Sequence, residues 1–251
     1  MFMRFLQIKI KRDVTAEFER FYEEIVMPQM QKVPGCLFAG LIRHKPEENE
    51  FASLTFWKEQ EDAENYEQSG IFQSLVDKAR PLLSESNEWK IHLSDNMQLE
   101  YEPVAEEPVI KKYSVADAGY HPDKLNIKSS PIYIRIVSVK VQPGKAEEFK
   151  DLFNTEVIPV LKSTKGCRDI FLTQSIHQND EFISVTIWDS EKDAELYENS
   201  GKFAQLAEML KKTFSQFYLW KMSLEKNYSA KVKTSEDIKI EKYDLITGRS
   251  F

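Results

Sequence analysis

The chain has few of the residues that usually build metal centres and phosphate loops. Among its 251 residues are only two cysteines, four histidines and eight glycines. Two thiols make no disulfide framework and no CxxC metal pair, and the sequence contains no phosphate-cradling glycine loop and no nucleophile elbow. We therefore expect no metal site. Cys36 and Cys167 each follow a glycine, and we interpret them as small buried side chains, with a reactive thiol or a disulfide between them as alternatives.

The chain also lacks a long apolar run and an excess of positive charge. Its formal charge is −7 and its pI is near 5.3, so no counterion release would favour binding to nucleic acid. The basic and aromatic signature of RNA-binding sheets is missing too. Residues 1–13 alternate apolar and polar side chains without a cleavage site, which predicts a strand and not a signal peptide. We expect a globular cytoplasmic protein that binds neither nucleic acid nor membrane.

The most informative feature is an internal repeat. The stretch DAENYEQSG, Asp62 to Gly70, returns 131 residues later as DAELYENSG, Asp193 to Gly201. Residues 4–93 pair with residues 135–224 without a gap, and 27 of the 90 paired positions are identical. This predicts two homologous domains, at 1–95 and 131–226. Residues 96–130 then hold an extra strand or arm and the linker, and residues 227–251 hold a C-terminal extra strand or arm.

Hydrophobic periodicity predicts the same element order in both repeats. In the first repeat, residues 2–10 alternate as a strand, and the next stretch has a helical period. Residues 36–44 and 51–57 read as a hairpin, helices follow around Asp62 and from residue 72, and residues 88–94 read as a fourth strand, matched by 219–225. The residues expected on the inner face of the first helix are Phe18, Phe21, Ile25 and Met30.

The order strand, helix, strand, strand, helix, strand defines a ferredoxin-like α+β domain. Each domain leaves one face of its sheet uncovered, so we expect the two to pack sheet to sheet as an intramolecular pseudo-dimeric β-barrel. Two separate domains on a linker are the alternative. Residues 109–119 loosely match 238–248, and we expect these segments to pair with the sheet edge of the other domain.

Residues 56–72 and 187–203 resemble the strand-end tryptophan and following helix of the antibiotic biosynthesis monooxygenase family. The resemblance covers both repeats. It implies ferredoxin-like units whose dimers enclose a β-barrel, with a pocket between sheet and helices in each unit. The family includes cofactor-independent oxygenases of aromatic polyketides and quinols, as well as haem-degrading enzymes.

The haem-degrading branch of that family uses an asparagine, a tryptophan and a histidine. This sequence departs from all three, because the matching positions carry Leu6 and Val137, Tyr66 and Tyr197, and Val76 and Ala207. Without the imidazole, haem iron has no anchor in either pocket. The resemblance therefore implies that no cofactor is needed.

An arginine interrupts the apolar face of the first strand in both repeats. Arg4 shares its face with Leu6, and Arg135 shares its face with Val137. The arginine either reaches solvent or a helix carboxylate, or it stabilises an enolate or carboxylate ligand. The helix acids, Glu67 among them, are expected on the outer face.

Tyr66 and Tyr197 are expected on the inward face of their helix. Each hydroxyl either bonds a backbone group or lines a pocket. No histidine recurs at the same place in both repeats, and His92 is the only one on a predicted core element. The catalytic candidates are thus Tyr66, Tyr197, Arg4 and Arg135, and the expected substrate-binding residues are Trp57, Trp188, Phe72, Phe203, Leu6 and Val137.

These residues, together with the resemblance, predict a cofactor-independent monooxygenase acting on an aromatic or quinol-type small molecule. The alternative is a non-catalytic binding or regulatory module for a hydrophobic metabolite. The expected partner is a small hydrophobic or aromatic molecule, and a further homodimer is left open.

Overall fold

The computed structural model describes residues 1–45, 47–93, 99–105, 108–118, 132–215 and 239–251. The first repeat contains β1 (Phe2–Lys9), β2 (Cys36–His44) and β3 (Glu50–Trp57), and its helical segments are α1 (Thr15–Phe21), α2 (Met27–Met30), α3 (Gln60–Gln68) and α4 (Ile71–Ala79). A π-helical turn, Tyr22–Val26, joins α1 to α2, and a 3-10 turn, Arg80–Leu82, follows α4.

The second repeat has the matching elements. Its strands are β7 (Tyr133–Lys140), β8 (Cys167–Ser175) and β9 (Glu181–Trp188), and its helices are α5 (Ala146–Leu152), α6 (Ile158–Lys162), α7 (Glu191–Asn199) and α8 (Lys202–Leu210). The π-helical turn here is Phe153–Val157 and the 3-10 turn is Lys211–Thr213. Strands β6 (Val109–Ala118) and β10 (Lys239–Ser250) lie outside the repeats.

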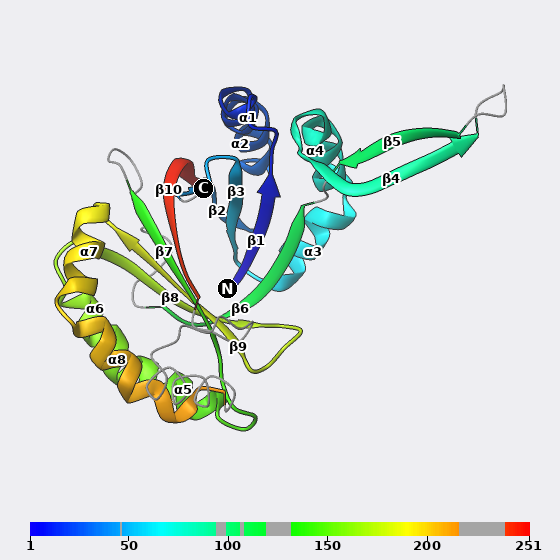
Figure 1. The fold of residues 1–251 in the computed structure, drawn as a ribbon. Helices are drawn as coiled ribbons and strands as arrows, with labels where there is room; N and C mark the ends of the chain where they lie inside the picture. Colours follow the sequence, from blue (N-terminus) through cyan, green and yellow to red (C-terminus); the bar gives the residue numbers. More distant parts are fainter. Residues whose placement is uncertain (46, 94–98, 106–107, 119–131, 216–238) are drawn as a thin grey trace, which may run out of the picture. The chain divides into compact units, whose positions relative to one another are not determined.

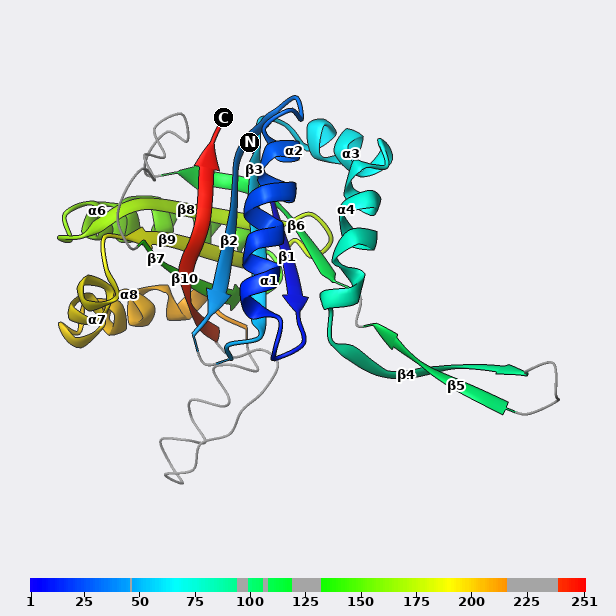
Figure 2. The same cartoon turned by 90° about the horizontal axis from the view of Figure 1, so that it is seen from above.

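Eight strands of the described chain hydrogen-bond in the closed order β1-β3-β2-β10-β7-β9-β8-β6. The expected fold class is therefore confirmed: an α+β chain with two tandem repeats and one antiparallel β-barrel. In each repeat the helices lie on one face of the strands, as Figures 1 and 2 show for α1 to α4 and for α5 to α8. No helix in the described ranges is both long and apolar enough to cross a membrane.

The chain divides into two compact units. Each unit contains one repeat together with a segment that follows the other repeat in the sequence. One unit is formed by residues 1–3, 112–245 and 250, and the other by residues 4–111, 246–249 and 251. Within the first of these, β6 pairs antiparallel with β8, from Tyr113 opposite Ser175 to Ala118 opposite Phe171. Within the other, the N–H of Phe251 donates to the carbonyl of Leu37 on β2. The expectation of exchanged strands is confirmed for β6.

The predicted fourth strand forms but does not enter the barrel. Strand β4 (Glu85–Leu93) pairs with β5 (Leu99–Ala105) in a separate two-stranded sheet. In the barrel order the place beside β1 is taken by β6, so the expectation that residues 88–94 complete the first sheet is wrong. The matching place beside β7 is taken by β10, which runs antiparallel to it from Lys239 opposite Ser138 to Asp244 opposite Tyr133. The other predicted fourth strand, at 219–225, lies outside the described residues.

A proline sets the π-helical turn in each repeat. Pro28 and Pro159 have no N–H to give to the carbonyl four residues earlier. The helix widens before each proline, and Met27 donates to the carbonyl of Tyr22 while Ile158 donates to that of Phe153, both five residues back. The extra residue per turn shifts the buried face.

This shift corrects the predicted inner face of the first helix. Tyr22 is 2% exposed and Val26 is buried, whereas Ile25 is 39% exposed. A regular 3.6-residue period would have turned Ile25 inward. The π-helical turn therefore decides which side chains reach the space between helix and sheet.

The residues at both ends of the repeated nonapeptide have a local structural role in each repeat. Ser190 caps α7 by accepting a hydrogen bond from the N–H of Asp193. After the helix, Gly70 and Gly201 have φ near +79° and +78° and mark the turn into the next helix. Most large apolar side chains are buried, and those exposed among the described residues are Ile25, Leu196, Met209 and Phe251.

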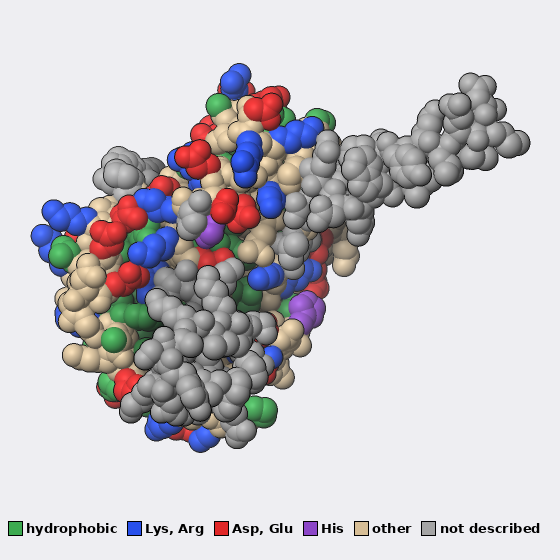
Figure 3. Space-filling model, in the orientation of Figure 1, with side chains coloured by type: hydrophobic (Ala, Val, Ile, Leu, Met, Phe, Trp, Pro, Cys, Tyr) green, Lys and Arg blue, Asp and Glu red, His purple; other side chains and the backbone are tan. Residues whose placement is uncertain are grey.

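Charged side chains of both signs are scattered over the described part of the surface drawn in Figure 3. On the face drawn in Figure 3, Lys and Arg lie among Asp and Glu.

Cys36 is buried and Cys167 is half-buried, and both are free thiols, so the alternative of a disulfide between them is excluded. Burial raises the pKa of each thiol to about 12, which keeps them protonated and weakly nucleophilic at neutral pH.

Gly35 provides a direct test of how the repeat packs. Its φ is +75°, and a Cβ added there would lie 2.1 Å from Cγ of Asp62, whose carboxylate accepts the N–H of Glu59 at the start of α3. We predict that Gly35→Ala lowers the free energy of unfolding by about 2–4 kcal/mol, through backbone strain and loss of the cap.

Gly70→Ala is the matched control for this substitution. Gly70 has φ +79° but no atom within 4 Å of an added Cβ, so it should cost only the backbone strain, about 1–2 kcal/mol. Urea denaturation followed by circular dichroism measures both. Equal losses in the two variants would contradict the close approach of Gly35 to Asp62.

Candidate functional site

Each unit holds one pocket between its strands and its helices. The first is lined from β1, β3, α3, α4 and the π-helical turn, by residues that include Arg4, Leu6, Ile8, Tyr22, Ser53 and Tyr66. The second is lined by the matching positions, including Arg135, Val137, Val139, Phe153, Ser184 and Tyr197. Each cavity has a volume of about 50 Å³. Pockets that enclose drug-sized ligands measure roughly 300–1,000 Å³, so a multi-ring ligand would enter only if the wall moved.

A buried ion pair fixes the arginine of each pocket. Nε of Arg4 lies 2.8 Å from Oε1 of Glu67, and Nε of Arg135 lies 2.7 Å from Oε1 of Glu198. The arginine side chains are only 4% and 3% exposed. The expectation that these glutamates coat the outer helix face is wrong, since each turns toward the first strand. Glu67 stands four residues after buried Ala63, and that spacing was the available signal.

Two aromatic rings hold the guanidinium from the helix side. Cζ of Arg4 lies 5.4 Å from the ring centroid of Tyr66 and 4.7 Å from that of Phe72. The second pocket repeats this geometry, at 6.0 Å to Tyr197 and 4.3 Å to Phe203. Cation–π attraction of this kind strengthens when the pair is removed from water. The arginine is therefore held in place and does not reach into solvent.

Nη2 of each guanidinium remains available. Nη2 of Arg4 and Nη2 of Arg135 are buried and have no hydrogen-bond partner among the described residues. Nε of Arg4 is also buried without a hydrogen bond to a described residue, since its contact with Glu67 is an ion pair only, whereas Nε of Arg135 donates to Glu198. A guanidinium donates five hydrogen bonds and accepts none, and a buried donor without a partner is costly. An anionic or carbonyl oxygen bound in the pocket would satisfy Nη2.

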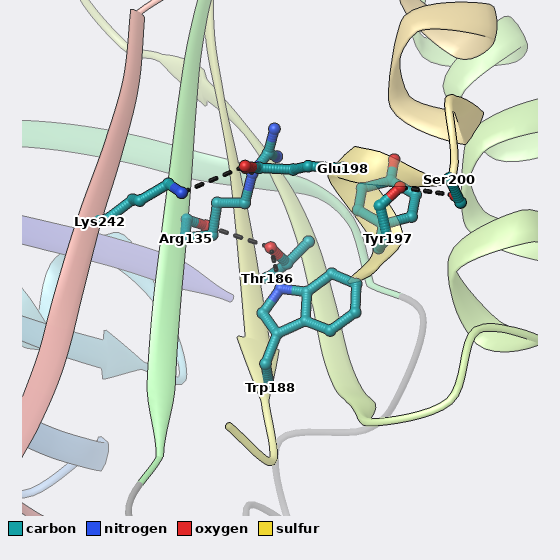
Figure 4. Close-up of polar contacts among 7 residues, drawn as sticks. All are labelled: Arg135, Thr186, Trp188, Tyr197, Glu198, Ser200 and Lys242. Carbon is teal, nitrogen blue, oxygen red and sulfur yellow. Dashed lines mark hydrogen bonds and ion pairs between the residues drawn. The ribbon is translucent and has the colours of Figure 1, made fainter. Parts of the chain in front are cut away.

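In the second pocket a lysine adds to the ion pair. Figure 4 shows the carboxylate of Glu198 between Arg135 and Lys242, and Lys242 Nζ on β10 lies 3.1 Å from Oε2. Burial acts to raise the pKa of Glu198, but the hydrogen bonds and charges of Arg135 and Lys242 outweigh it, and the pKa is lowered overall. The carboxylate is therefore ionised at neutral pH.

Tyr66 and Tyr197 line the pockets. They are 4% and 3% exposed, and their rings lie 5.3 Å from those of Trp57 and Trp188. In the described part of the chain neither hydroxyl has a hydrogen-bond partner, so the alternative of a bond to a backbone carbonyl is not observed. Burial raises the pKa of both hydroxyls to about 12, although the nearby arginine lowers it. At neutral pH they are proton donors and not bases.

The remaining predicted residues divide into two groups. The four that line the pockets are Phe72, Phe203, Leu6 and Val137. Trp57 and Trp188 are fully buried and are not among the described lining residues. Each indole N–H donates to a threonine hydroxyl at 2.9 Å, Thr55 or Thr186, and Figure 4 shows the bond between Trp188 and Thr186. The tryptophans support the wall that the ligand would touch.

Neither pocket has an obvious general base. The described lining of each pocket contains no histidine, aspartate or glutamate. His44 lies 3.5 Å from Glu50, and His92 is on β4 in the separate two-stranded sheet. The residues present do not fit the haem-degrading mechanism, because the imidazole it requires is missing from both linings. The described residues also include no group of three or more His, Cys, Asp and Glu able to hold a metal ion.

One polar pair of the first pocket was not predicted from the sequence. The hydroxyl of Tyr22 and Oγ of Ser53 lie 2.7 Å apart inside the first pocket. In the second pocket Ser184 is retained, but Phe153 replaces the tyrosine. The signal was present in the sequence, because Tyr22 and Phe153 each lie four residues after a buried phenylalanine, Phe18 or Phe149, and so share its face of a regular helix.

Comparison with known proteins agrees with this arrangement. The family model described as antibiotic biosynthesis monooxygenase matches residues 1–78 and 132–209, one segment in each repeat. No curated protein matches the sequence.

Several solved structures share the fold over nearly the whole chain. A candidate monooxygenase from Fusobacterium nucleatum is 8% identical, with a TM-score of 0.67 over 99% of this chain and 94% of that one. One from Lactobacillus acidophilus is 9% identical, with a TM-score of 0.62 over 99% and 95%. An anthrone oxidase-like protein is 11% identical, with a TM-score of 0.58 over 99% and 92%. At these identities the likeness shows the fold alone.

The ion pair of the second pocket makes a stability prediction. Glu198→Ala leaves Arg135 buried without its carboxylate, and we expect the free energy of unfolding to fall by about 1–3 kcal/mol at pH 7. Glu195→Ala, an exposed position on the same helix, should change it by less than about 0.5 kcal/mol.

The pH dependence of the free energy of unfolding of Glu198→Ala checks whether the charge of Glu198 is the cause of this stabilisation. The pKa of Glu198 is lower in the folded protein than in the unfolded chain. Glu198 therefore stabilises the fold fully at pH values above its pKa in the unfolded chain, and this contribution is lost as the pH falls through its pKa in the folded protein. The difference between the native chain and Glu198→Ala should therefore shrink in acid. A difference that stays constant from pH 7 to pH 3 would show that the charge of Glu198 is not what stabilises the fold.

Proposed function

Because the chain belongs to the antibiotic biosynthesis monooxygenase family, we propose that it is a cofactor-independent monooxygenase of an aromatic or quinol-type small molecule. The observation that carries this proposal is the buried guanidinium with an available Nη2 on the wall of a largely apolar pocket. Such a pocket favours a flat apolar molecule that carries one ionised oxygen. The name of the anthrone oxidase-like neighbour is consistent with this class.

The chemistry requires little from the protein beyond binding and charge stabilisation. A phenol or enol that has lost its proton can give an electron to dioxygen, so the protein must favour the ionised form and exclude water. Nη2 of Arg4 would donate to the oxyanion, and the apolar wall would strengthen that interaction. For an anthrone-type substrate, one oxygen atom becomes the new ring carbonyl. The other leaves as water with the two hydrogens of the ring CH2.

Tyr66 would act as a second donor. It is protonated throughout the physiological range, because its pKa is about 12, and its ring already contacts the guanidinium. A neutral phenol donates a hydrogen bond to an oxyanion but does not remove a proton from the substrate. The hydroxyl of the substrate would therefore give its proton to water as the substrate binds.

A specific observation also supports the second candidate function, a non-catalytic binding module. The described lining of both pockets has no carboxylate or imidazole to act as a base. A protein that only held a hydrophobic phenol would need the arginine and the apolar wall but no base. The two functions differ in whether dioxygen is consumed.

Oxygen uptake with a panel of quinols and hydroxylated polycyclic aromatics tests the proposal. We expect Arg4→Met together with Arg135→Met to slow uptake about 100-fold or more, because each pocket loses an oxyanion donor, and Tyr66→Phe together with Tyr197→Phe to slow it less. Lysine at both arginine positions keeps the charge without the planar fork and should recover part of the rate. Arg12→Met, at an exposed arginine, is the control and should leave uptake unchanged.

The outcomes separate the two functions. Saturable binding without uptake of oxygen for any member of the panel would contradict the monooxygenase and favour the binding module. Uptake that is insensitive to both Arg4→Met and Arg135→Met would show that the reaction does not use these pockets.

The pH profile gives an independent prediction. Since Tyr66 stays protonated below its pKa of about 12, we expect the rate to rise between pH 6 and 10 with the ionisation of the substrate hydroxyl. The midpoint should therefore move from substrate to substrate with the pKa of that hydroxyl. One fixed midpoint for all substrates would instead reveal a base on the protein.

A further inference from the structure

The helical segment before the first hairpin of each repeat forms one wall of each pocket. In the first repeat this segment, residues 15–30, supplies lining residues from Phe18 to Met30. In the second repeat residues 146–162 supply lining residues from Phe149 to Leu161. We call these two segments the outer helices. Since each cavity measures only about 50 Å³, a ligand of several rings requires a wall to move.

The other helical wall is tied to the sheet in the same way in both repeats. Glu67 of α3 pairs with Arg4 of β1, and Glu198 of α7 pairs with Arg135 of β7. The two pockets can therefore differ in mobility at their outer helices.

Two side chains tie the outer helix of the first repeat to the neighbouring hairpin. Oε1 of Glu19 lies 3.2 Å from Nη1 of Arg43 on β2. Inside the pocket, the hydroxyl of Tyr22 lies 2.7 Å from Oγ of Ser53 on β3. The first bond joins the helix to one strand and the second joins it to the next.

A third tie reaches the strand from beyond the repeats. The carboxylate of Glu23 accepts hydrogen bonds from the hydroxyl of Thr247 and from Nη2 of Arg249, both on β10. All of these residues belong to the same compact unit. Because positions 19, 22 and 23 lie within little more than one helical turn, the π-helical turn is held to the sheet at its most distorted point.

The matching positions of the second repeat carry residues that cannot make these ties. They are Lys150, Phe153 and Asn154. Lys150 pairs with Glu147 of its own helix, and Phe153 has no hydroxyl. Oδ1 of Asn154 is buried and has no hydrogen-bond partner in the described part of the chain. Asparagine also carries no charge, so it cannot form the ion pair that Glu23 makes.

The strand partner differs as well. Gln174 stands where the first repeat has Arg43, and its Nε2 donates to the carbonyl of Asn179 in the hairpin between β8 and β9. The second outer helix does have an ion pair with another element, between Glu148 and Lys212 at 2.9 Å, but Lys212 belongs to the 3-10 turn after α8. These contacts connect the second outer helix to its own helical layer, whereas those of the first connect it to the sheet.

We propose that the second pocket is the one that widens to take an aromatic ligand of two or three rings, whereas the first keeps its resting size and excludes such a ligand. Glu19, Tyr22 and Glu23 are then the residues that determine which ring systems the first pocket accepts. The inference deepens the proposed function, on which it rests only for the statement that the ligand is a substrate.

Amide hydrogen exchange of the ligand-free chain, read by mass spectrometry, tests the difference between the two outer helices. Local opening exposes helical amides to exchange. Partly exposed ion pairs and single hydrogen bonds contribute modestly to stability, so we expect protection factors roughly tenfold lower for residues 149–161 than for residues 18–30. Equal protection, or lower protection in the first outer helix, would overturn the inference.

The number of binding sites tests the selection by size. The probes are 2-naphthol and 2-hydroxyanthracene, titrated without oxygen in a calorimeter. We expect one site per chain for each probe, weakened tenfold or more by Arg135→Met and unchanged by Arg4→Met. Two equivalent sites, a single site that depends on Arg4, or no saturable site would each contradict the assignment to the second pocket.

The first repeat can be given the residues of the second. The triple variant Glu19→Lys, Tyr22→Phe and Glu23→Asn should lower the protection of residues 18–30 roughly tenfold and add a second site for 2-naphthol. Glu17→Lys, at an exposed position of the same helix, makes the same change of charge without touching a tie, and should do neither. A folded triple variant with unchanged protection and one site would overturn the inference.

A variant of the second repeat serves if the triple variant does not fold. Lys150→Glu together with Gln174→Arg copies the ion pair of the first repeat. It should raise the protection of residues 149–161 and weaken the binding of 2-naphthol roughly threefold to tenfold. Tighter binding together with unchanged protection would show that the ties do not control the wall.

The inference and the proposed function fail separately. A single 2-naphthol site in the second pocket without oxygen uptake keeps the selection by size and contradicts the monooxygenase. Oxygen uptake with two equivalent 2-naphthol sites keeps the monooxygenase and contradicts the selection. Because the exchange and binding experiments need no oxygen, turnover does not enter their results.

Discussion

The ion pair between the first-strand arginine and the helix glutamate is the interaction on which both pockets depend. A guanidinium placed among apolar side chains loses its hydration, and this loss is offset only when a carboxylate and aromatic rings surround it. Glu67 and Glu198 supply the charge, at 2.8 Å and 2.7 Å. Nη2 of each arginine, a residue of the pocket wall, is left without a hydrogen-bond partner among the described residues. The interaction that allows the arginine to be buried is thus also what leaves it able to bind an anion.

The repeated nonapeptide is explained by this interaction. Its Asp begins the helix, its Ala packs against the sheet, its Gly ends the helix, and its Tyr and Glu together hold the arginine. The fold and the pocket walls followed from the sequence because the period of the strands and the duplication are local patterns. Tyr66 was also correctly expected to face inward. Glu67 was not expected to do so, because a charged residue on a helix is usually solvated.

Of the other differences, one has a local cause and one has a distant cause. Ile25 was predicted inside because a regular helix was assumed, although its partner in the second repeat is Glu156, a residue that does not suit a core. Pro28 widens the turn before it, so that Val26 is buried and Ile25 is exposed. The displacement of β4 by later strands depends on β6 and β10, which come from beyond the repeats. No local period encodes that exchange. A duplicated chain can also keep one pocket while the other diverges, as Tyr22 and Phe153 illustrate.

The central claim is that a buried arginine stabilises the ionised form of an aromatic ligand. It is tested most directly by the pKa of a bound nitrophenol, read from its absorbance band during a pH titration of the complex. The account predicts that the bound hydroxyl ionises at lower pH than the free molecule, and that Arg4→Met together with Arg135→Met abolishes the shift. A bound pKa equal to or above that of free nitrophenol would contradict it, because an apolar pocket without an available cation raises the pKa of a phenol.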